Sequence, residues 1–363
     1  MTEALGQSTM IQEIRQQPAV LERTLKTELG TAEELRSIFA RKKPRLIVLV
    51  ARGTSDNAAQ FGRYLLEIST GVPVSLAAPS VFTLYDASLD FQDVLVVAIS
   101  QSGESTDTNL VLEKARAQGA MTLGITNESA SALARIAEHL FLVRAGKEKS
   151  VAATKTYTGQ LLTLYLLAYA LGARVELDDL RRLSDWTSEA LKLELQIAER
   201  AERYRFMEHA VVIARGLNYS NAFEFALKLM ETCYVVAERF SAADLLHGPI
   251  AMVDASFPVF LFAPPGVSWP GLAQLLDRLV ALKAETLVIS DISNEGVAGY
   301  INGGRTRHRL CIPAALAAKC EPVDLYTPIP YIIPAQLFAA HLACTKGLDA
   351  DHPRTLKKVT RTL

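Results

Sequence analysis

Cysteine is scarce in this sequence, and the spacing of the few cysteines excludes two kinds of site. The chain has 363 residues, of which four are cysteine. They form no CxxC pair and no cluster with histidine at the spacing of a metal site, and each lies within or beside an apolar stretch. We therefore expect reduced thiols in the core, and neither a metal ion nor another cofactor. The cysteines are Cys233, Cys311, Cys320 and Cys344.

An excess of charge and a long apolar run are also missing. The 38 basic residues nearly balance the 39 acidic ones, so no overall field attracts nucleic acid or an anionic membrane. The longest apolar stretch, 161–171, is far shorter than the roughly 20 residues of a membrane helix. The first residues, MTEALGQSTM, do not resemble a secretory signal. We expect a cytoplasmic protein without nucleic-acid or membrane partners. Any anionic ligand must then be bound by a local group of residues rather than attracted by the overall charge.

What the sequence does contain is a regular alternation of short β-branched runs with amphipathic helical stretches such as 107–118. This alternation predicts an α/β fold in which helices cover both faces of parallel sheets. The expected strands are 46–50, 94–100, 122–126 and 139–143, followed by 210–214, 258–263, 285–290 and 309–313.

An internal repeat divides the chain into two copies of one α/β domain. Val-Ala-Arg-Gly at 50–53 recurs as Ile-Ala-Arg-Gly at 213–216, and the loops after the next strands correspond at the same offset. The length also favours two domains. We predict a helical leader at 1–35, a first domain at 36–175, connecting helices at 176–203, a second domain at 204–345 and a tail at 346–363.

Hydroxyl side chains gather after two predicted strands of the first copy. Such loops lie at the carboxyl ends of parallel strands, where the next helix presents N–H groups and its positive dipole end to an anion. They predict a phosphate site without a lysine, although the same residues commonly cap helices. The second copy has Ala263, Pro264 and Pro265 there, and neither GxGxxG nor GxxxxGK[ST] occurs, which disfavours a nucleotide site. The predicted phosphate-binding residues are Gly53, Thr54, Ser55, Ser100, Gln101, Ser102 and Ser105.

Six segments together resemble the ordered motifs of the sugar isomerase (SIS) domain family. The resemblance covers nearly the whole chain, and within the family the chain is similar to the isomerase half of glucosamine-6-phosphate synthase and to stand-alone deaminases and deglycases. It implies two tandem SIS-type, flavodoxin-like αβα domains. The segments are GTS at 53–55, SQSGES at 100–105, VAATKTYTGQ at 151–160, ALKLME at 226–231, LLHGP at 245–249 and the tail lysine Lys358.

Glu224, Lys228 and Glu231 are spaced i, i+4 and i+7, so one face of a predicted helix carries all three, beside an apolar stripe of Phe223, Leu227, Met230 and Tyr234. The spacing alone is equally typical of an exposed ion pair between Glu224 and Lys228. The resemblance implies a catalytic helix, on which Glu231 moves a proton between C1 and C2 of an open-chain sugar, with Lys228 beside it.

The remaining site residues also depend on the resemblance. A lone histidine is usually structural, but the family histidine at the place of His247 opens the sugar ring and comes from the neighbouring subunit, which implies a homodimer. Lys358 matches the lysine that reacts with or orients the open-chain carbonyl, although a lysine in a basic tail is most often solvated. Val151 and Ala153 fall at the family's sugar-contacting positions.

The resemblance leaves several reactions open. The synthases carry an amidotransferase domain ahead of this region, and only a short segment precedes the first strand here, so we expect glucosamine-6-phosphate deaminase activity that yields fructose 6-phosphate and ammonia. Arg52, Ala153 and Leu246 stand where the synthases have Cys, Ser and Lys, which leaves the choice of sugar open. A fructosamine-type 6-phosphate deglycase, an ammonia-dependent isomerase/synthase and a non-enzymatic sugar-phosphate sensor are the alternatives.

Overall fold

The computed structural model describes residues 8–302, 308–319 and 321–358. The chain forms two compact units, each made of separate stretches of the sequence. Unit 1 holds the chain up to Pro18, Lys149–Ala152 and Arg182–Leu356. Unit 2 holds Ala19–Glu148, Ala153–Arg181 and the chain from Lys357. The domain boundaries expected from the sequence, which are contiguous, stay predictions.

Unit 2 is built on a parallel five-stranded sheet with the order β2-β1-β3-β4-β5. Because β2 and β3 flank β1, the strand order reverses at β1, and the loops after β1 and β3 leave neighbouring strands at the carboxyl end of the sheet. The strands are β1 (Leu46–Val50), β2 (Val74–Leu76), β3 (Val94–Ile99), β4 (Met121–Thr126) and β5 (His139–Leu142).

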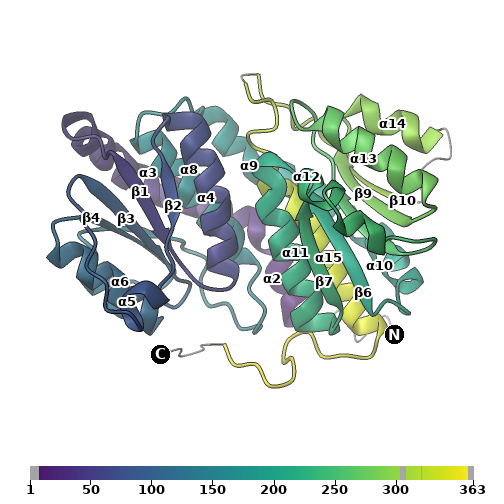
Figure 1. The fold of residues 1–363 in the computed structure, drawn as a ribbon, viewed down its shortest axis with the longest axis horizontal. Helices are drawn as coiled ribbons and strands as arrows, with labels where there is room; N and C mark the ends of the chain where they lie inside the picture. Colours follow the sequence, from purple (N-terminus) through teal and green to yellow (C-terminus); the bar gives the residue numbers. More distant parts are fainter. Residues whose placement is uncertain (1–7, 303–307, 320, 359–363) are drawn as a thin grey trace. The chain divides into compact units, whose positions relative to one another are not determined.

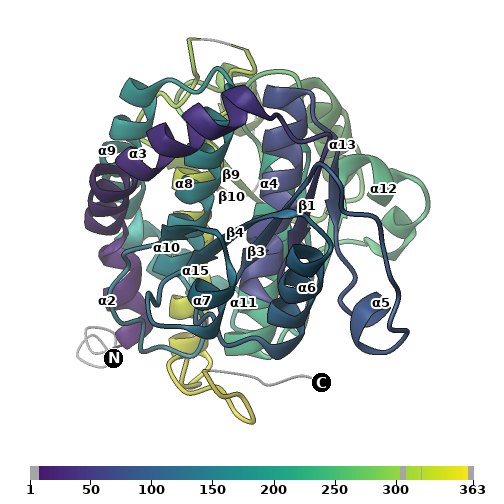
Figure 2. The ribbon, with the colours of Figure 1, turned by 90° about the vertical axis from the view of Figure 1, so that its left-hand side faces the viewer.

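Helices cover both faces of this sheet (Figure 2). Val48 and Val96 belong to a buried cluster with residues of α5, α6 and α7. On the other face, Gly62 of α4 lies so close to Leu49 and Leu164 that a Cβ there would come within 3.0 Å of both side chains. The helices are α3 (Gln17–Arg41, mostly in this unit), α4 (Thr54–Thr70), α5 (Ser80–Thr83), α6 (Thr106–Ala117), α7 (Ala132–Ile136) and α8 (Lys155–Ala170).

Unit 1 repeats this sheet with the order β10-β9-β8-β6-β7, so β6 takes the place of β1 and β8 that of β3. A buried cluster joins one face to α12, α13 and α14, which are labelled in Figure 1. On the other face, Phe260 contacts Tyr204, Phe225 of α11 and Phe338 of α15. The strands are β6 (His209–Ala214), β7 (Val236–Ser241), β8 (Pro258–Phe262), β9 (Glu285–Asp291) and β10 (His308–Ile312).

The helices of unit 1 come from both ends of the chain. Arg15 on α2 makes a bidentate ion pair with Glu194 on α10, so α2 is tied to the helix before β6. The helices are α2 (Thr9–Arg15), α10 (Glu194–Arg203), α11 (Tyr219–Cys233), α12 (Ala242–Leu246), α13 (Trp269–Ala281), α14 (Glu295–Asn302) and α15 (Pro328–Thr345), with 3-10 turns at Gly216–Asn218 and Pro249–Met252, while α9 (Leu177–Leu191) begins in unit 2.

The predicted fold class, two α/β layers with parallel sheets, is confirmed, and every strand expected from the sequence forms to within a few residues. Two strands were not expected, β2 and β7. Both lie at sheet edges: β2 has only three residues, and β7 carries exposed polar side chains, so neither shows the apolar run of a buried strand.

The cysteines are less deeply placed than the sequence suggests. Cys233 is a buried free thiol, and burial raises its pKa to about 12. Cys311 and Cys344 are also free thiols but are only partly buried, because each lies near the end of its strand or helix, which corrects the expectation of core positions. Cys320 lies outside the described residues. In the part of the chain that the structure describes, no helix combines the length and apolarity needed to cross a bilayer.

Candidate functional site

The loop between β3 and α6, residues 100–105, is called the serine loop below. It is folded by its own hydroxyl groups: the Gly103 N–H donates to Ser100 Oγ at 3.1 Å, and the Glu104 N–H donates to Ser102 Oγ at 3.3 Å. Because each hydroxyl oxygen accepts a bond here, its own proton stays available for an acceptor such as a phosphate oxygen. The Gln101 carbonyl accepts the Asn127 N–H at 3.1 Å and so fastens the loop to the end of β4.

Gly103 is required by the packing of the serine loop. Its backbone has φ of +66°, a region that glycine enters without strain, and a Cβ at this position would lie 2.2 Å from Ser131 Oγ. The Gly103 carbonyl accepts the Leu133 N–H at 3.0 Å and the Asn109 side-chain N–H at 3.1 Å. The loop is therefore held rigidly against the start of α7 and the first turns of α6.

Helix capping, the alternative for the hydroxyl groups, does not occur at these two helices. Ser105 occupies the N-cap position of α6 and Gly53 that of α4, and neither makes a side-chain capping bond. Ser55 lies inside α4, where its Oγ accepts a hydrogen bond from Gln160 of α8 at 2.9 Å. Thr54, the first residue of α4, is partly exposed. These hydroxyl groups therefore have a placement that capping does not explain.

An arginine stands beside this hydroxyl cluster. Arg52 Nε donates to Asp107 Oδ2 at 2.6 Å, and Ser105 Oγ donates to Asp107 Oδ1 at 2.9 Å. Burial raises the pKa of Asp107, but hydrogen bonds from Arg52 and Ser105 and the guanidinium charge outweigh burial and lower it. The Arg52 side chain is half exposed, so the loop after β1 adds a positive group next to the first turn of α6.

The loop before α8 carries the predicted sugar-contacting residues and one residue that the sequence did not reveal. Val151 belongs to unit 1, where its N–H donates to the Asp351 carbonyl at 3.2 Å, while Ala153 is a partly exposed residue of unit 2. Glu148, in the same loop, is fully buried and pairs with Lys358 Nζ at 3.0 Å. Spacing gives no sign of this pair, because 210 residues separate its members.

On α11 the three charged residues do share one face, and that face is buried rather than exposed. Lys228 Nζ lies 3.3 Å from Glu224 Oε1 and 2.6 Å from Glu231 Oε2. Lys228 and Glu224 are completely buried, whereas a quarter of the Glu231 side chain is accessible. Burial lowers the pKa of Lys228, but the charges of the two glutamates outweigh burial and raise it, so Lys228 is a permanent cation.

The apolar stripe expected beside these charges does not form the buried face of α11. Phe223, Leu227 and Tyr234 are partly exposed and Met230 is exposed, while the core contacts come from Phe225 and neighbouring residues on the side of the charges. The exposed ion pair that the spacing also allows is thereby excluded.

His247 lies at the end of α12 and is exposed, with its backbone N–H donating to the Asp244 carbonyl at 3.1 Å. The turn expected from Gly248 and Pro249 is present: Gly248 has φ of +147°, and Pro249 begins a 3-10 helix. Within the described part of unit 1, no hydrogen bond or ion pair joins His247 to Glu231, so one copy of this unit presents the two side chains separately.

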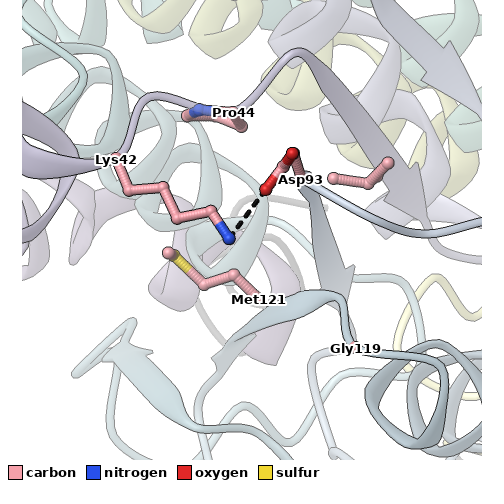
Figure 3. Close-up of a pocket in the computed structure, with 6 residues that line it drawn as sticks. Lys42, Pro44, Asp93, Gly119 and Met121 are labelled. Atoms are coloured by element: carbon pink, nitrogen blue, oxygen red, sulfur yellow. Dashed lines mark ion pairs between the residues drawn. The ribbon is translucent and has the colours of Figure 1, made fainter.

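A small cavity of about 20 Å³ lies beside the first residues of β3 and β4 (Figure 3). The serine loop follows the other end of β3. Lys42 and Asp93 face each other across it and form an ion pair of 2.7 Å, with Met121 at the start of β4 beside them. A space of this size holds about one water molecule, and it lies at the amino ends of the strands. It is not a candidate substrate site.

A family model described as the SIS domain matches the chain twice, at residues 40–170 and 206–346. The first segment runs from before β1 to the end of α8, and the second runs from before β6 through α15. Each segment therefore contains one of the two parallel sheets with its helices. The resemblance drawn from the six motifs is confirmed.

Among curated relatives, glutamine–fructose-6-phosphate aminotransferase (isomerizing) of Pseudomonas putida is 37% identical over 366 residues, which cover 96% of this chain and 58% of the relative. The chain thus spans well under two thirds of that protein's length. Of the solved structures, the C-terminal domain of glucosamine-fructose-6-phosphate aminotransferase from Francisella tularensis is 29% identical with a TM-score of 0.84 over 96% of this chain and 98% of that one. Glucosamine-6-phosphate deaminase from Thermotoga maritima shares the fold, with a TM-score of 0.78 and 22% identity over 98% of this chain and all of that one.

Proposed function

Because the chain belongs to the SIS domain family, we propose that it is an enzyme that isomerises and deaminates an amino-sugar phosphate, with glucosamine 6-phosphate as its substrate. The observation that carries this proposal is the α11 triad, in which one accessible carboxylate, Glu231, is held by a buried permanent cation. The names of the aminotransferase relatives combine amino transfer with a sugar phosphate, which supports this proposal.

The serine loop is proposed to hold the phosphate group. Ser100 and Ser102 keep hydroxyl protons for phosphate oxygens, and the N-terminus of α6 adds its positive dipole end. The loop after β1, with Gly53, Thr54 and Ser55, leaves the neighbouring strand at the same end of the sheet. Together with Gln101 and Ser105 they make the phosphate subsite.

Glu231 is proposed to carry the proton between the two carbon atoms. Once the ring is open, the Glu231 carboxylate removes the proton from C2, which bears the amine, and returns it to C1. The C1 oxygen gains a second proton and the amine nitrogen loses one, so the C1 aldehyde becomes an alcohol and C2 becomes an imine. Water then adds to the imine, ammonia leaves, and fructose 6-phosphate remains. Lys228 keeps the carboxylate oriented during this transfer, because its buried ammonium lies 2.6 Å from Glu231 Oε2.

His247 and Lys358 are proposed to act on the same substrate before that step. A histidine exchanges protons near neutral pH, so His247 is suited to opening the sugar ring. Its exposure in the single chain is compatible with its acting in the site of a neighbouring subunit, which makes a homodimer part of this proposal. Lys358 orients or condenses with the C1 carbonyl, and Val151 and Ala153 line the sugar.

The test is release of ammonia from glucosamine 6-phosphate by the purified chain, measured with coupled glutamate dehydrogenase. We expect steady release with equimolar fructose 6-phosphate. The reverse mixture, fructose 6-phosphate with ammonia, measures the ammonia-dependent synthase direction on the same preparation. If neither mixture reacts, the proposed function is wrong.

One observation favours a second candidate, a fructosamine-type 6-phosphate deglycase. Ala153 is partly exposed and has no hydroxyl to offer a sugar, which supports a substrate other than the one that the synthases bind. Fructose-lysine 6-phosphate, assayed beside glucosamine 6-phosphate, separates the two enzymes by the amine released. A thermal shift with sugar phosphates and no turnover of either would instead indicate a sensor.

A further inference from the structure

Glu148 is a fully buried carboxylate to which the proposed chemistry gives no role. It lies in the loop between β5 and α8 and has no exposed side-chain surface. A carboxylate that has lost its water must be paired, because an isolated buried charge costs several kcal/mol. Its partners are the first turn of α8 and, from the tail, Lys358.

The two oxygens of Glu148 serve different partners. Oε1 accepts the backbone N–H groups of Thr154 at 2.9 Å and Thr156 at 3.2 Å, which fixes the loop to the start of α8. Oε2 accepts the Thr156 hydroxyl at 2.7 Å and Lys358 Nζ at 3.0 Å. One oxygen therefore shapes the loop that contains Ala153, and the other holds the tail amine beside it.

The ionisation of Glu148 is consistent with these two sets of contacts. Burial raises the pKa of Glu148, but the Lys358 charge and the hydrogen bonds from Thr154 and Thr156 outweigh burial and lower it. Glu148 is therefore a carboxylate at neutral pH. Three quarters of the Lys358 side chain is covered, so the tail amine is taken from solvent and placed at one position.

We propose that Glu148 is a positioning residue for Lys358: it docks the tail of the chain at the sugar-contacting loop and sets the place of the Lys358 amine for the open-chain carbonyl. The inference rests on the proposed function for the role of the carbonyl, but the docking itself does not. The tail before Lys358 has separate anchors in unit 1, where the Arg354 N–H donates to the Tyr234 hydroxyl at 2.8 Å. Loss of the Glu148 contact should therefore free only the part of the tail that follows Arg354.

Glu148→Gln separates the two functions of the carboxylate. The amide oxygen can still accept the N–H groups of Thr154 and Thr156, whereas the amide nitrogen faces the Lys358 ammonium as donor against donor. Thr156→Val is the matched control, since it removes a hydroxyl from the same oxygen without touching the ion pair. Limited trypsin digestion followed by mass spectrometry measures cleavage after Lys357, with cleavage after Arg354 as the internal reference.

In Glu148→Gln we expect cleavage after Lys357 to accelerate roughly 10- to 100-fold, as the loss of a charged hydrogen bond predicts, and cleavage after Arg354 to stay slow. We expect kcat to fall by a similar factor at an unchanged KM, because the phosphate subsite is intact. Thr156→Val should change neither the rate of cleavage after Lys357 nor kcat.

Equal protection of the tail in Glu148→Gln and wild type, or a freed tail with unchanged kcat, would overturn the inference. If Glu148→Gln does not fold, Lys358→Met removes the same pair from its partly exposed side, and a tail as protected as in wild type would count equally against it. Absence of turnover in the wild-type protein would instead concern the proposed function, because the digestion needs no substrate.

Discussion

Glu231 and Lys228 are neighbours on α11 whose surroundings differ sharply. Lys228 is sealed in the core between two carboxylates, and Glu231 reaches solvent with a quarter of its side chain. A proton carrier needs both properties: a fixed orientation, which the 2.6 Å contact to Lys228 supplies, and access to the reacting carbons. Glu224 has the first property without the second, so among the carboxylates of this helix only Glu231 can reach a substrate.

Glu231→Gln tests that assignment. We expect kcat to fall by at least about 100-fold, the contribution typical of a general base, while calorimetric binding of the sugar phosphate changes little because the phosphate grip remains. The control is Glu238→Gln, an exposed carboxylate on β7, which should leave both quantities unchanged. Turnover that survives in Glu231→Gln would remove Glu231 from the mechanism.

Within unit 1, polar contacts hold α2 in place. Besides the pair of Arg15 with Glu194 on α10, the Asp351 carboxylate accepts the Thr9 and Met10 N–H groups, each at 2.7 Å. These contacts join the beginning of the chain to a segment near its end. A carboxylate at a helix N-terminus also compensates the helix dipole. The docking of α2 should therefore depend on carboxylate charge.

The Arg15–Glu194 pair predicts how unit 1 responds to acid. Burial raises the pKa of Glu194, but contacts with His341 and Arg15 outweigh burial and lower it from 4.5 to about 2. The stabilisation that the ionised Glu194 gives to the folded state is therefore present above pH 4.5, and it is lost as the pH falls toward 2. Because Arg15 is partly exposed, we expect the contacts of Glu194 to add about 1–3 kcal/mol to the free energy of unfolding, which is less than the pKa shift alone would imply.

Glu194→Gln should lower the free energy of unfolding by that amount at pH 7, and its deficit relative to wild type should shrink toward zero at pH 2, as measured by urea denaturation across pH. Glu199→Gln, an exposed position on the same helix, is the matched control and should track the wild type throughout. A deficit that is independent of pH would contradict the electrostatic origin.

In the proposed mechanism, His247 acts either in the site of its own chain or in the site of a partner subunit. The exposed His247 has no hydrogen bond to Glu231 within the described part of unit 1. A homodimer in which each site takes His247 from the partner reconciles this with their proposed cooperation. Complementation between two inactive variants distinguishes the two arrangements, because in a mixed dimer with shared sites one site collects both substitutions and the other site has neither.

We expect mixed dimers of Glu231→Gln and His247→Asn to regain activity, although each variant alone is inactive. Random exchange makes half of the dimers mixed, and each mixed dimer has one intact site, so about a quarter of wild-type activity should return. Size-exclusion chromatography verifies the dimer, and the same variants without subunit exchange are the control. No recovery after verified exchange would place His247 in its own chain's site.

Local sequence patterns predicted a large part of this structure. The β-branched runs and their spacing determined the parallel α/β architecture, because a strand buried on both faces must be apolar along its whole length. The serine loop follows β3 directly, and the reversal of strand order at β1 makes β1 and β3 neighbours, so the loops after both strands lie at the same end of the sheet. Helical period likewise determined that Glu224, Lys228 and Glu231 share a face, since residues three and four apart are neighbours on a helix.

Tertiary structure alone decided what those faces contact. The helical period could not tell whether the α11 charges meet solvent or core, and packing buried Glu224 and Lys228 while leaving the neighbouring apolar stripe partly exposed. Nor could spacing reveal that Glu148 meets Lys358 across 210 residues of chain. The reason is physical: hydrogen bonds within an element follow from local geometry, whereas the partner of a buried charge is chosen by how distant segments pack together.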